Sequence, residues 1–244
     1  GPALTLAAST VGGQLTLTQS GDRNTATLHQ SDDGSAYLGG TATYPPGGTY
    51  PPGGKPISIS TITQGGNGNT ADVTQKTATS ALPNTSGIDQ SGNGNGATVV
   101  QYDDFQNSSV SQGGSGNTAN VTQGLDNGAD NSYANNSSVV QGGDGNEANV
   151  NQAALAGTST VNQGGSDNVA NLNQHDGQLQ SSSIDQSGTN GFADVDQSGN
   201  TMSSSVDQRA DINKAIVKQA GSNSSSTVTQ LKNNNAARVT QRSA

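Results

Sequence analysis

Glutamine recurs along this chain in pairs whose members stand eleven residues apart, and nine such pairs divide the sequence. The spacing within a pair never changes, whereas the step from one pair to the next ranges from 11 to 34 residues. The underlying unit is therefore 22 residues in two halves of eleven, and every insertion falls at the same junction. Solenoids behave in this way, because one turn is fixed and the other accepts loops. The pairs are Gln19/Gln30, Gln64/Gln75, Gln90/Gln101, Gln112/Gln123, Gln141/Gln152, Gln163/Gln174, Gln186/Gln197, Gln208/Gln219 and Gln230/Gln241.

Around these glutamines, small and aliphatic residues alternate with polar ones. An aliphatic residue stands two positions before the first glutamine of every pair, and another stands nine positions after it. Alanine lies seven positions after that glutamine in all nine repeats, and asparagine five positions after it in eight. Alternation with β-branched residues predicts strands, and tetrads such as Gly65-Gly66-Asn67-Gly68 predict tight turns between them. The asparagines are Asn24, Asn69, Asn95, Asn117, Asn146, Asn168, Asn213 and Asn235.

Folding the chain after the first glutamine of a repeat sets large residues against small ones. The glutamine then faces the asparagine, and the aliphatic residue before it faces the alanine. Two sheets about 10 Å apart can then meet over a thin core, which suits a chain with 28% hydrophobic and 3% aromatic residues. One rung buries only two large aliphatics, so stacking is required. We predict an all-β, cross-β β-solenoid of nine stacked strand-turn-strand β-arches, about 40 Å tall at about 4.8 Å per rung.

Stacking also predicts what the inward amides bond to. A buried amide without a partner costs about 1–3 kcal/mol. A glutamine repeated at the strand spacing meets the same residue in the rungs above and below, as in cross-β structure. We therefore expect the eighteen glutamines and eight asparagines named above to form structural ladders.

The pattern S-x-φ-x-Q-x-G-x-x-N-x-A-x-φ-x-Q resembles the curlin repeat, and residues 108–123 carry it whole. The resemblance covers residues 15–241. It implies a secreted subunit that assembles outside the cell into curli-type amyloid fibres of a biofilm matrix. It also implies two partners, a nucleating minor subunit and a dedicated outer-membrane secretion channel.

The repeat predicts a simple domain organisation with open ends. An N-terminal segment covers residues 1–14, the solenoid covers 15–241 with a long insertion at 31–56, and a tail covers 242–244. Neither terminal segment is expected to form a firm cap, and uncovered strand edges pair with other strands. We therefore predict a homopolymer that grows head to tail. Its polymerisation ends are Leu17 and Leu28 in the first rung, and Val228 and Val239 in the last.

The charge distribution supports head-to-tail growth and disfavours nucleic acid as a partner. Residues 1–208 hold 3 basic and 17 acidic residues (−14), and residues 209–244 hold 6 basic and 1 acidic (+5), giving the net −9. Asp22, Asp32 and Asp33 in the first repeat would attract the basic last repeats. An acidic body, with a basic end that lacks aromatic residues, disfavours nucleic-acid binding.

Other sites are not expected. The chain has no cysteine, so it has no disulfide or thiolate metal site, and no apolar run is long enough for membrane insertion. We interpret His29 as outward-facing, and His175, which follows Gln174, as solvated in a turn rather than part of a Ser-His-Asp site. Asp103 and Asp104 are interpreted as solvating loop charges. We predict no catalytic residue, no metal and no cofactor.

One alternative function is a soluble β-solenoid that binds ice or another regular surface. Outward threonine pairs at Thr16/Thr18 and Thr61/Thr63 favour it. A lattice would need the same pair on every rung, and other repeats carry Gly87/Asp89 or Ser138/Val140 there. Threonine is also simply a good strand residue, so we rank this function below the fibre.

Overall fold

The computed structural model describes residues 8–11, 13–31, 58–77, 83–125 and 132–243. Within these ranges the regular elements are nineteen strands, and none is a helix. The predicted all-β solenoid is therefore confirmed. No helix in the described ranges is long and apolar enough to cross a membrane. Most of the insertion at 31–56, including Asp32 and Asp33, lies outside the described residues.

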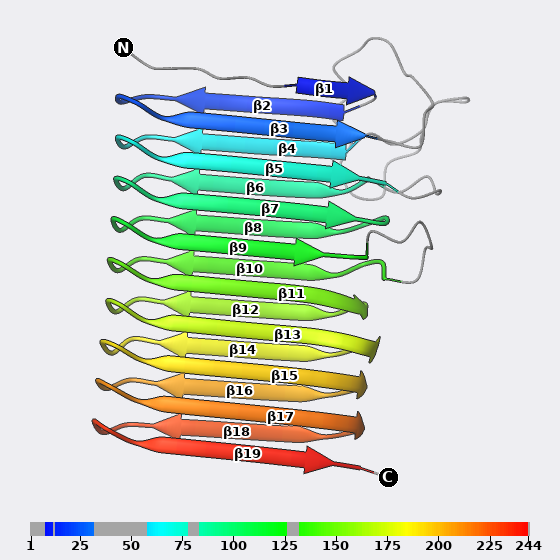
Figure 1. Ribbon diagram of the computed structural model, residues 1–244, viewed down its shortest axis with the longest axis vertical. Helices are drawn as coiled ribbons and strands as arrows, with labels where there is room; N and C mark the ends of the chain where they lie inside the picture. The colour runs from blue at the N-terminus through cyan, green and yellow to red at the C-terminus, as the bar shows by residue number, and fades with distance from the viewer. Residues whose placement is uncertain (1–7, 12, 32–57, 78–82, 126–131, 244) are drawn as a thin grey trace.

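The strands form two parallel sheets whose members alternate along the chain (Figure 1). The ten-stranded sheet holds β1 (Ala8–Val11), β3 (Thr25–Ser31), β5 (Thr70–Lys76), β7 (Gly96–Tyr102), β9 (Thr118–Gln123), β11 (Glu147–Leu155), β13 (Val169–Gln178), β15 (Phe192–Asn200), β17 (Lys214–Ser222) and β19 (Ala236–Arg242). The nine-stranded sheet holds β2 (Gly13–Gln19), β4 (Ser58–Gln64), β6 (Thr85–Gln90), β8 (Asn107–Gln112), β10 (Asn136–Gln141), β12 (Thr158–Gln163), β14 (Ser181–Gln186), β16 (Ser203–Gln208) and β18 (Ser225–Gln230).

Each even-numbered strand and the odd-numbered strand after it form one rung. The first rung is thus β2–β3 and the ninth is β18–β19. Consecutive rungs pair in register, so that glutamine stands beside glutamine along both sheets. Strand β1 is additional: it belongs to no complete rung in the described residues and pairs with the outer edge of β3.

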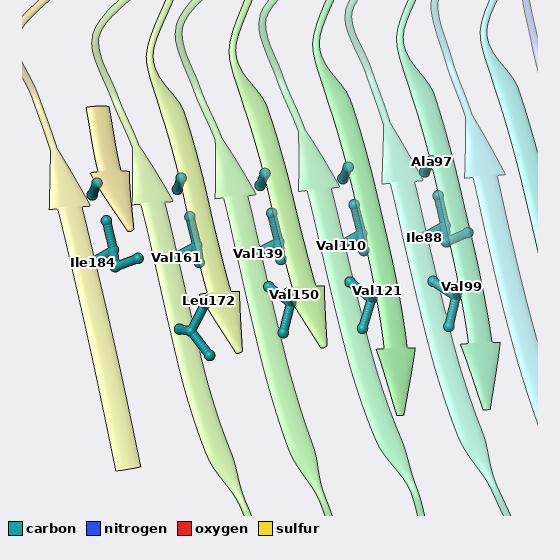
Figure 2. Packing of buried hydrophobic residues seen from close by; sticks show 14 of the residues in the cluster. Ile88, Ala97, Val99, Val110, Val121, Val139, Val150, Val161, Leu172 and Ile184 are labelled. Atoms are coloured by element: carbon teal, nitrogen blue, oxygen red, sulfur yellow. The ribbon is translucent and has the colours of Figure 1, made fainter. Parts of the chain in front are cut away.

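The core lies between the sheets and follows from the period-two pattern. In β5, for example, every second side chain is buried and those between are not. Figure 2 shows the inward aliphatic side chains in rows that run from rung to rung, one row from each sheet. Because the same small side chains repeat at each level, a continuous core forms without aromatic residues. The labelled rows are Ile88, Val110, Val139, Val161 and Ile184, and Val99, Val121, Val150 and Leu172.

From the second rung onward, the first turn of each rung contains one residue with positive φ. In the second rung it is Gly68 (φ 68), whereas the eighth rung has Ile212 (φ 58). A β-branched residue is strained in this conformation. The turns also stack closely: a Cβ added to Gly66 would lie 1.8 Å from the carbonyl oxygen of Gly92 in the next rung. Glycine is therefore required at Gly66 by the close approach of the two backbones, and it is favoured at Gly68 by the positive φ of the turn.

The expectation that Asp103 and Asp104 are solvated is wrong, and part of the N-terminal segment pairs with the first rung. Asp103 and Asp104 are 2% and 1% exposed rather than solvated, and a carboxylate oxygen of Asp103 accepts a hydrogen bond from the Leu125 N–H at 3.2 Å. The sequence does not predict a firm cap from the N-terminal segment; β1 covers the edge of β3 over four positions, while β2 stays an edge in the described residues.

The strand ends at Gln174 and Gln197 are also corrected. The sequence places a turn directly after the second glutamine of a repeat, and His175 in that turn after Gln174. Instead β13 continues past Gln174 to Gln178, so His175 lies within a strand, and β15 continues past Gln197 to Asn200. The steps from these glutamines to the next ones are 12 and 11 residues. Turns of nearly equal length stack in register, so parallel pairing extends into them, as at Ser198–Asn200 opposite Ala220–Ser222.

Candidate polymerisation interface

The inward glutamines form two continuous ladders, one in each sheet. In the nine-stranded sheet each Nε2 donates to the Oε1 of the glutamine in the next rung, from Gln19 to Gln230, at 2.6–2.9 Å. In the ten-stranded sheet the same bonds run from Gln30 to Gln241 at 2.6–3.0 Å. The structure thus brings all eighteen glutamines together.

The ladder is unbroken where the strands run past their glutamines. Nε2 of Gln174 donates to Oε1 of Gln197 at 3.0 Å, and Nε2 of Gln197 donates to Oε1 of Gln219 at 2.9 Å. Both Gln174 and Gln197 are 0% exposed. The difference therefore concerns only where strands end, in β11 and β17 as well as in β13 and β15. Gln174 and Gln197 stand at the inward ladder position that the sequence assigns to them.

A second hydrogen bond, from Nε2 to a backbone carbonyl oxygen, fixes the direction of the ladders. Nε2 of Gln64 donates to the carbonyl oxygen of Thr25 at 3.0 Å, and Nε2 of Gln101 donates to that of Thr85 at 2.8 Å. A reversed amide would set Oε1 against a carbonyl oxygen, so the hydrogen-bond network determines the orientation. Every ladder bond therefore points its donor toward the C-terminal rung.

The asparagine position forms a different kind of ladder from the one expected. The backbone N–H of Asn69 donates to Oδ1 of Asn24 at 2.9 Å, and Nδ2 of Asn69 donates to the carbonyl oxygen of Gly92 at 2.8 Å. These side chains bond to main chain and not to each other, and they hold the stacked turns in place. The backbone N–H makes the same bond to the preceding rung at Asn95, Asn117, Asn146, Asn168 and Asn235.

The asparagine series is interrupted at the seventh rung. Gly191 stands there, and its N–H still donates to Oδ1 of Asn168 at 2.7 Å. Gly191 has no side chain that could accept from the next rung. In the eighth rung, Nδ2 of Asn213 donates to the carbonyl oxygen of Ala210 in its own turn at 2.8 Å. The glutamine ladders are therefore the only side-chain hydrogen-bond series of the repeat that runs through all nine rungs in the described residues.

A third series of hydrogen bonds, which the sequence did not predict, lies at the other turn. The backbone N–H of Gln106 donates to Oδ1 of Asn84 at 2.8 Å, and the N–H of Asn135 donates to Oε1 of Gln106 at 3.1 Å. All three side chains are buried. They stand six positions before the first glutamine of their repeats. Counting backward from that glutamine would have found them, whereas counting forward crosses insertions of unequal length.

The C-terminal end of the solenoid is level and open. Strands β18 and β19 belong to one rung and are the last of their sheets. Val239 and Gln241 are partly exposed, although their counterparts Val150 and Gln152 are buried. Nε2 of Gln241 donates to the carbonyl oxygen of Ser225 at 2.8 Å. Its second hydrogen has no further glutamine to meet among the described residues.

The N-terminal end is uneven. On β2, Leu17 and Gln19 are partly exposed, and this strand is the edge of its sheet in the described residues. On β3, Leu28 and Gln30 are 0% and 1% exposed. Oε1 of Gln30 is buried and has no hydrogen-bond partner. The first rung thus ends in glutamine acceptors where the last ends in glutamine donors.

Charge adds less to this polarity than the sequence implied. On the described part of the first rung, the charge of Asp22 is offset by its neighbour Arg23. The two other acidic residues of that repeat lie outside the described residues. The last two rungs carry the basic residues Arg209, Lys214, Lys218, Lys232, Arg238 and Arg242.

The outward positions of the paired threonines do not carry one residue type on every rung in the described part of the chain. The paired threonines of the first and second rungs recur in the ninth as Thr227 and Thr229, but not in the rungs between. His175 lies between two carboxylates: Nδ1 is 2.6 Å from Asp176 and Nε2 is 3.0 Å from Asp196. No group of three or more His, Cys, Asp or Glu side chains in the described ranges could hold a metal ion.

Comparison with known families supports the resemblance noted in the sequence. Residues 203–231 match the family model described as the curlin associated repeat. The match spans the eighth rung and continues through β18 of the ninth. A comparison with curated proteins found no match. The curlin repeat family is structural and generally extracellular, and a structural subunit is consistent with both this match and the solenoid.

Proposed function

We propose that this chain, with a curlin associated repeat in an open-ended β-solenoid, is a secreted structural subunit that self-assembles head to tail into extracellular curli-like amyloid fibres of a biofilm matrix. The observation that carries the proposal is the direction of the glutamine ladders. Their donors all point toward the ninth rung. A ninth rung stacked on the first rung of a second copy would set donors against acceptors.

This polarity follows from the end groups. Gln230 and Gln241 offer donors, and Gln19 and Gln30 offer acceptors. Two ninth rungs facing each other would oppose donor to donor. Head-to-tail stacking also continues the parallel main-chain pairing, which open strand edges favour.

Apolar burial adds to the same contact. Val239 is partly exposed at one end and Leu17 at the other, and both pack against the core cluster. Stacking would complete the aliphatic rows of Figure 2 across the subunit boundary. Burial of apolar area stabilises association by about 25 cal/mol per Å² before the costs of binding.

The family resemblance also implies two partners for this assembly. A nucleating minor subunit would need to present one rung with glutamines in the same register, so that the first copy has a template. An outer-membrane secretion channel would deliver the chain before it stacks. Both partners are proposals supported by family resemblance.

Electron microscopy and fibre diffraction of the purified full chain test the proposal. We expect unbranched fibres with a reflection near 4.7–4.8 Å along the fibre axis. A chain that stays monomeric and binds a regular surface such as ice would contradict it.

A paired substitution tests the ladder contact itself. Gln230→Met with Gln241→Met removes both terminal donors at nearly constant volume. Two hydrogen bonds at about 1 kcal/mol each predict elongation slowed by roughly tenfold or more. Thr229→Val with Thr240→Val changes exposed positions on the same two strands and is the matched control. Equal elongation rates for the two variants would show that the glutamine ladders do not contribute to the interface.

A further inference from the structure

We propose that β1 is a removable cap: it occupies half of the N-terminal face of a free subunit, and the ninth rung of an incoming copy displaces it. This inference rests on the head-to-tail assembly proposed above. The ligand of the uncovered face is a second copy of this chain, through β18 and β19.

The alternation of the sheets carries the argument. From β2 to β19, each strand of one sheet is followed by a strand of the other (Figure 1). The series ends with β19 in the ten-stranded sheet, so its continuation must begin with a strand in the nine-stranded sheet. Strand β2 meets this requirement. Strand β1 does not, because it lies in the ten-stranded sheet on the edge of β3.

A copy that docked with β1 in place would join only one sheet. Its β19 would pair with β1, and its β18 would stand two strand spacings from β2, about 9.6 Å. Main-chain hydrogen bonds cannot form across that distance. With β1 displaced, β18 meets β2 and β19 meets β3 in one step, and both sheets continue.

The contact between β1 and β3 also breaks the glutamine ladder. In the pairing register Thr10 stands opposite Gln30. Oε1 of Gln30 is buried there without a partner, whereas the equivalent atom of Gln75 accepts from Gln30 at 2.6 Å. A buried acceptor without a donor is unfavourable. The Nε2 of Gln241 in an incoming copy would supply that donor.

The lengths of the strands favour the exchange. Strand β1 pairs with β3 over four residue positions, from Ala8 to Val11. Strand β19 pairs with β17 over seven, from Ala236 to Arg242. An incoming β19 would therefore form the longer ladder on β3. Until it arrives, β1 shields that edge from unwanted pairing.

A reversible disulfide tests the cap. Ser9 and His29 are register partners on β1 and β3, at a strand spacing within the range that a disulfide spans. The natural chain has no cysteine, so within one subunit Ser9→Cys with His29→Cys can form only this bridge. We expect the oxidised variant to elongate at least about tenfold more slowly than the reduced one, and dithiothreitol to restore growth.

The matched control locks two strands that never separate. Thr74→Cys with Val100→Cys joins register partners on β5 and β7, and should assemble equally well oxidised and reduced. If the β1 variant also assembles equally in both states, the cap is refuted while head-to-tail assembly stands. If neither the reduced variants nor the natural chain forms fibres, the proposed function fails instead.

A second variant loosens the cap without a crosslink. Ser9→Pro with Thr10→Pro removes two consecutive N–H donors from β1, one of which any parallel pairing must use. We expect a shorter lag and severalfold faster elongation, because the N-terminal face is exposed more often. Slower elongation would show that β1 belongs to the assembled interface, which overturns the proposal.

Discussion

Strands β3 and β19 carry the same motif in the same sheet at opposite ends of the molecule, but only β3 is buried. Leu28 and Gln30 of β3 are 0% and 1% exposed. Val239 and Gln241 of β19 are partly exposed. Strand β1 covers the first pair, and no strand in the described residues covers the second. Burial in this fold therefore depends on the neighbouring rung as much as on the residue itself.

The same comparison shows that a buried glutamine does not always have all its hydrogen bonds. Strand β1 buries Gln30 but leaves its Oε1 without a donor. An interior rung buries its glutamine and satisfies it in the same step, as for Gln123, which both accepts from Gln101 and donates to Gln152. On β3 the N-terminal end is thus closed to solvent but chemically incomplete, whereas β2 beside it and the C-terminal rung are open in the described residues.

The largest expected effect separates an interior glutamine from a terminal one. Gln123→Met leaves a hydrogen on Gln101 and Oε1 of Gln152 without partners, and two buried unsatisfied groups cost about 2–6 kcal/mol. Gln241→Met removes the acceptor of the Gln219 amide from a bond that is only partly buried, because Gln241 is itself partly exposed, and should cost about 1 kcal/mol or less. Urea denaturation of unassembled chain followed by circular dichroism measures both. Equal shifts in the midpoint would contradict the ladder account.

The next effect contrasts packing inside the stack with packing at its end. Ala148 is 0% exposed, so Ala148→Leu overpacks the core and should destabilise the subunit by about 1–3 kcal/mol and slow its assembly. Ala237 is partly exposed on β19. Ala237→Leu should leave the subunit nearly as stable and yet slow elongation.

Asn149→Leu is the control for these two variants, because the Asn149 side chain points outward and bonds to Asn171 at 3.0 Å on the surface. It should change both stability and elongation less than Ala148→Leu does. If Ala237→Leu destabilises the isolated subunit as strongly as Ala148→Leu, then β19 is covered in solution and does not present an open edge.

The turns give a smaller effect that again contrasts the middle with the end. Ile212 has φ 58 and is 56% exposed, and a β-branched residue in this region costs about 1–2 kcal/mol. Ile212→Gly should therefore stabilise the subunit by about 0.5–1 kcal/mol after the entropy of glycine is counted. Gly116 has φ 67 and free space around its Cβ position. Gly116→Ile should lower the urea midpoint, and a rise would show that the turn conformation is unstrained.

Most of the fold could be predicted because one period repeats through it. The glutamine spacing and the alternation around residues such as Val73 and Ala71 determine strands, register and inward faces together. Asp103 and Asp104 were misplaced because aspartate normally marks solvated loops. The step from Gln101 to Gln112 is eleven residues, the shortest in the chain. The turn between these glutamines is therefore tight, and the Asp103 and Asp104 side chains are buried in it.

The strand ends after Gln174 and Gln197 were misplaced for a related reason. Within one repeat, residues such as Ser198-Gly199-Asn200 have the composition of a turn. Their pairing with the next rung depends on the length of the neighbouring turn, which a single repeat does not contain. Comparing turn lengths between successive repeats would have indicated the longer strands.

The cap could not be predicted from the repeat. Residues 8–11 contain no glutamine, and Thr10 occupies the ladder position in the register. Nothing local distinguishes such a segment from a tail, because its pairing depends on the uncovered edge of β3. The direction of the glutamine ladders was equally hidden, since it depends on which carbonyl oxygens the second amide hydrogen reaches.

The smallest effect concerns pH and lies on the outer face, away from both ends. Burial alone would lower the pKa of His175, but hydrogen bonds and charge interactions with Asp176 and Asp196 outweigh burial and raise the pKa. Both ring nitrogens then donate, as in the imidazolium. A folded-state pKa above the unfolded value stabilises the subunit at pH below about 6.5. That contribution is lost as pH rises through the folded-state pKa.

Because the His175 side chain is only partly buried, with 30% of its surface exposed, solvent screens these interactions and the contribution should stay below about 1 kcal/mol. Urea midpoints at pH 5.5 and pH 8 measure it, and His175→Gln should flatten the difference between them. His29→Gln, at an exposed position on β3, should keep the natural profile. Both variants should form fibres at the natural rate, since neither side chain lies in a ladder or at a core position. An elongation defect in His175→Gln would place part of the assembly contact on the outer face of the rungs and would weaken the contrast between the two ends.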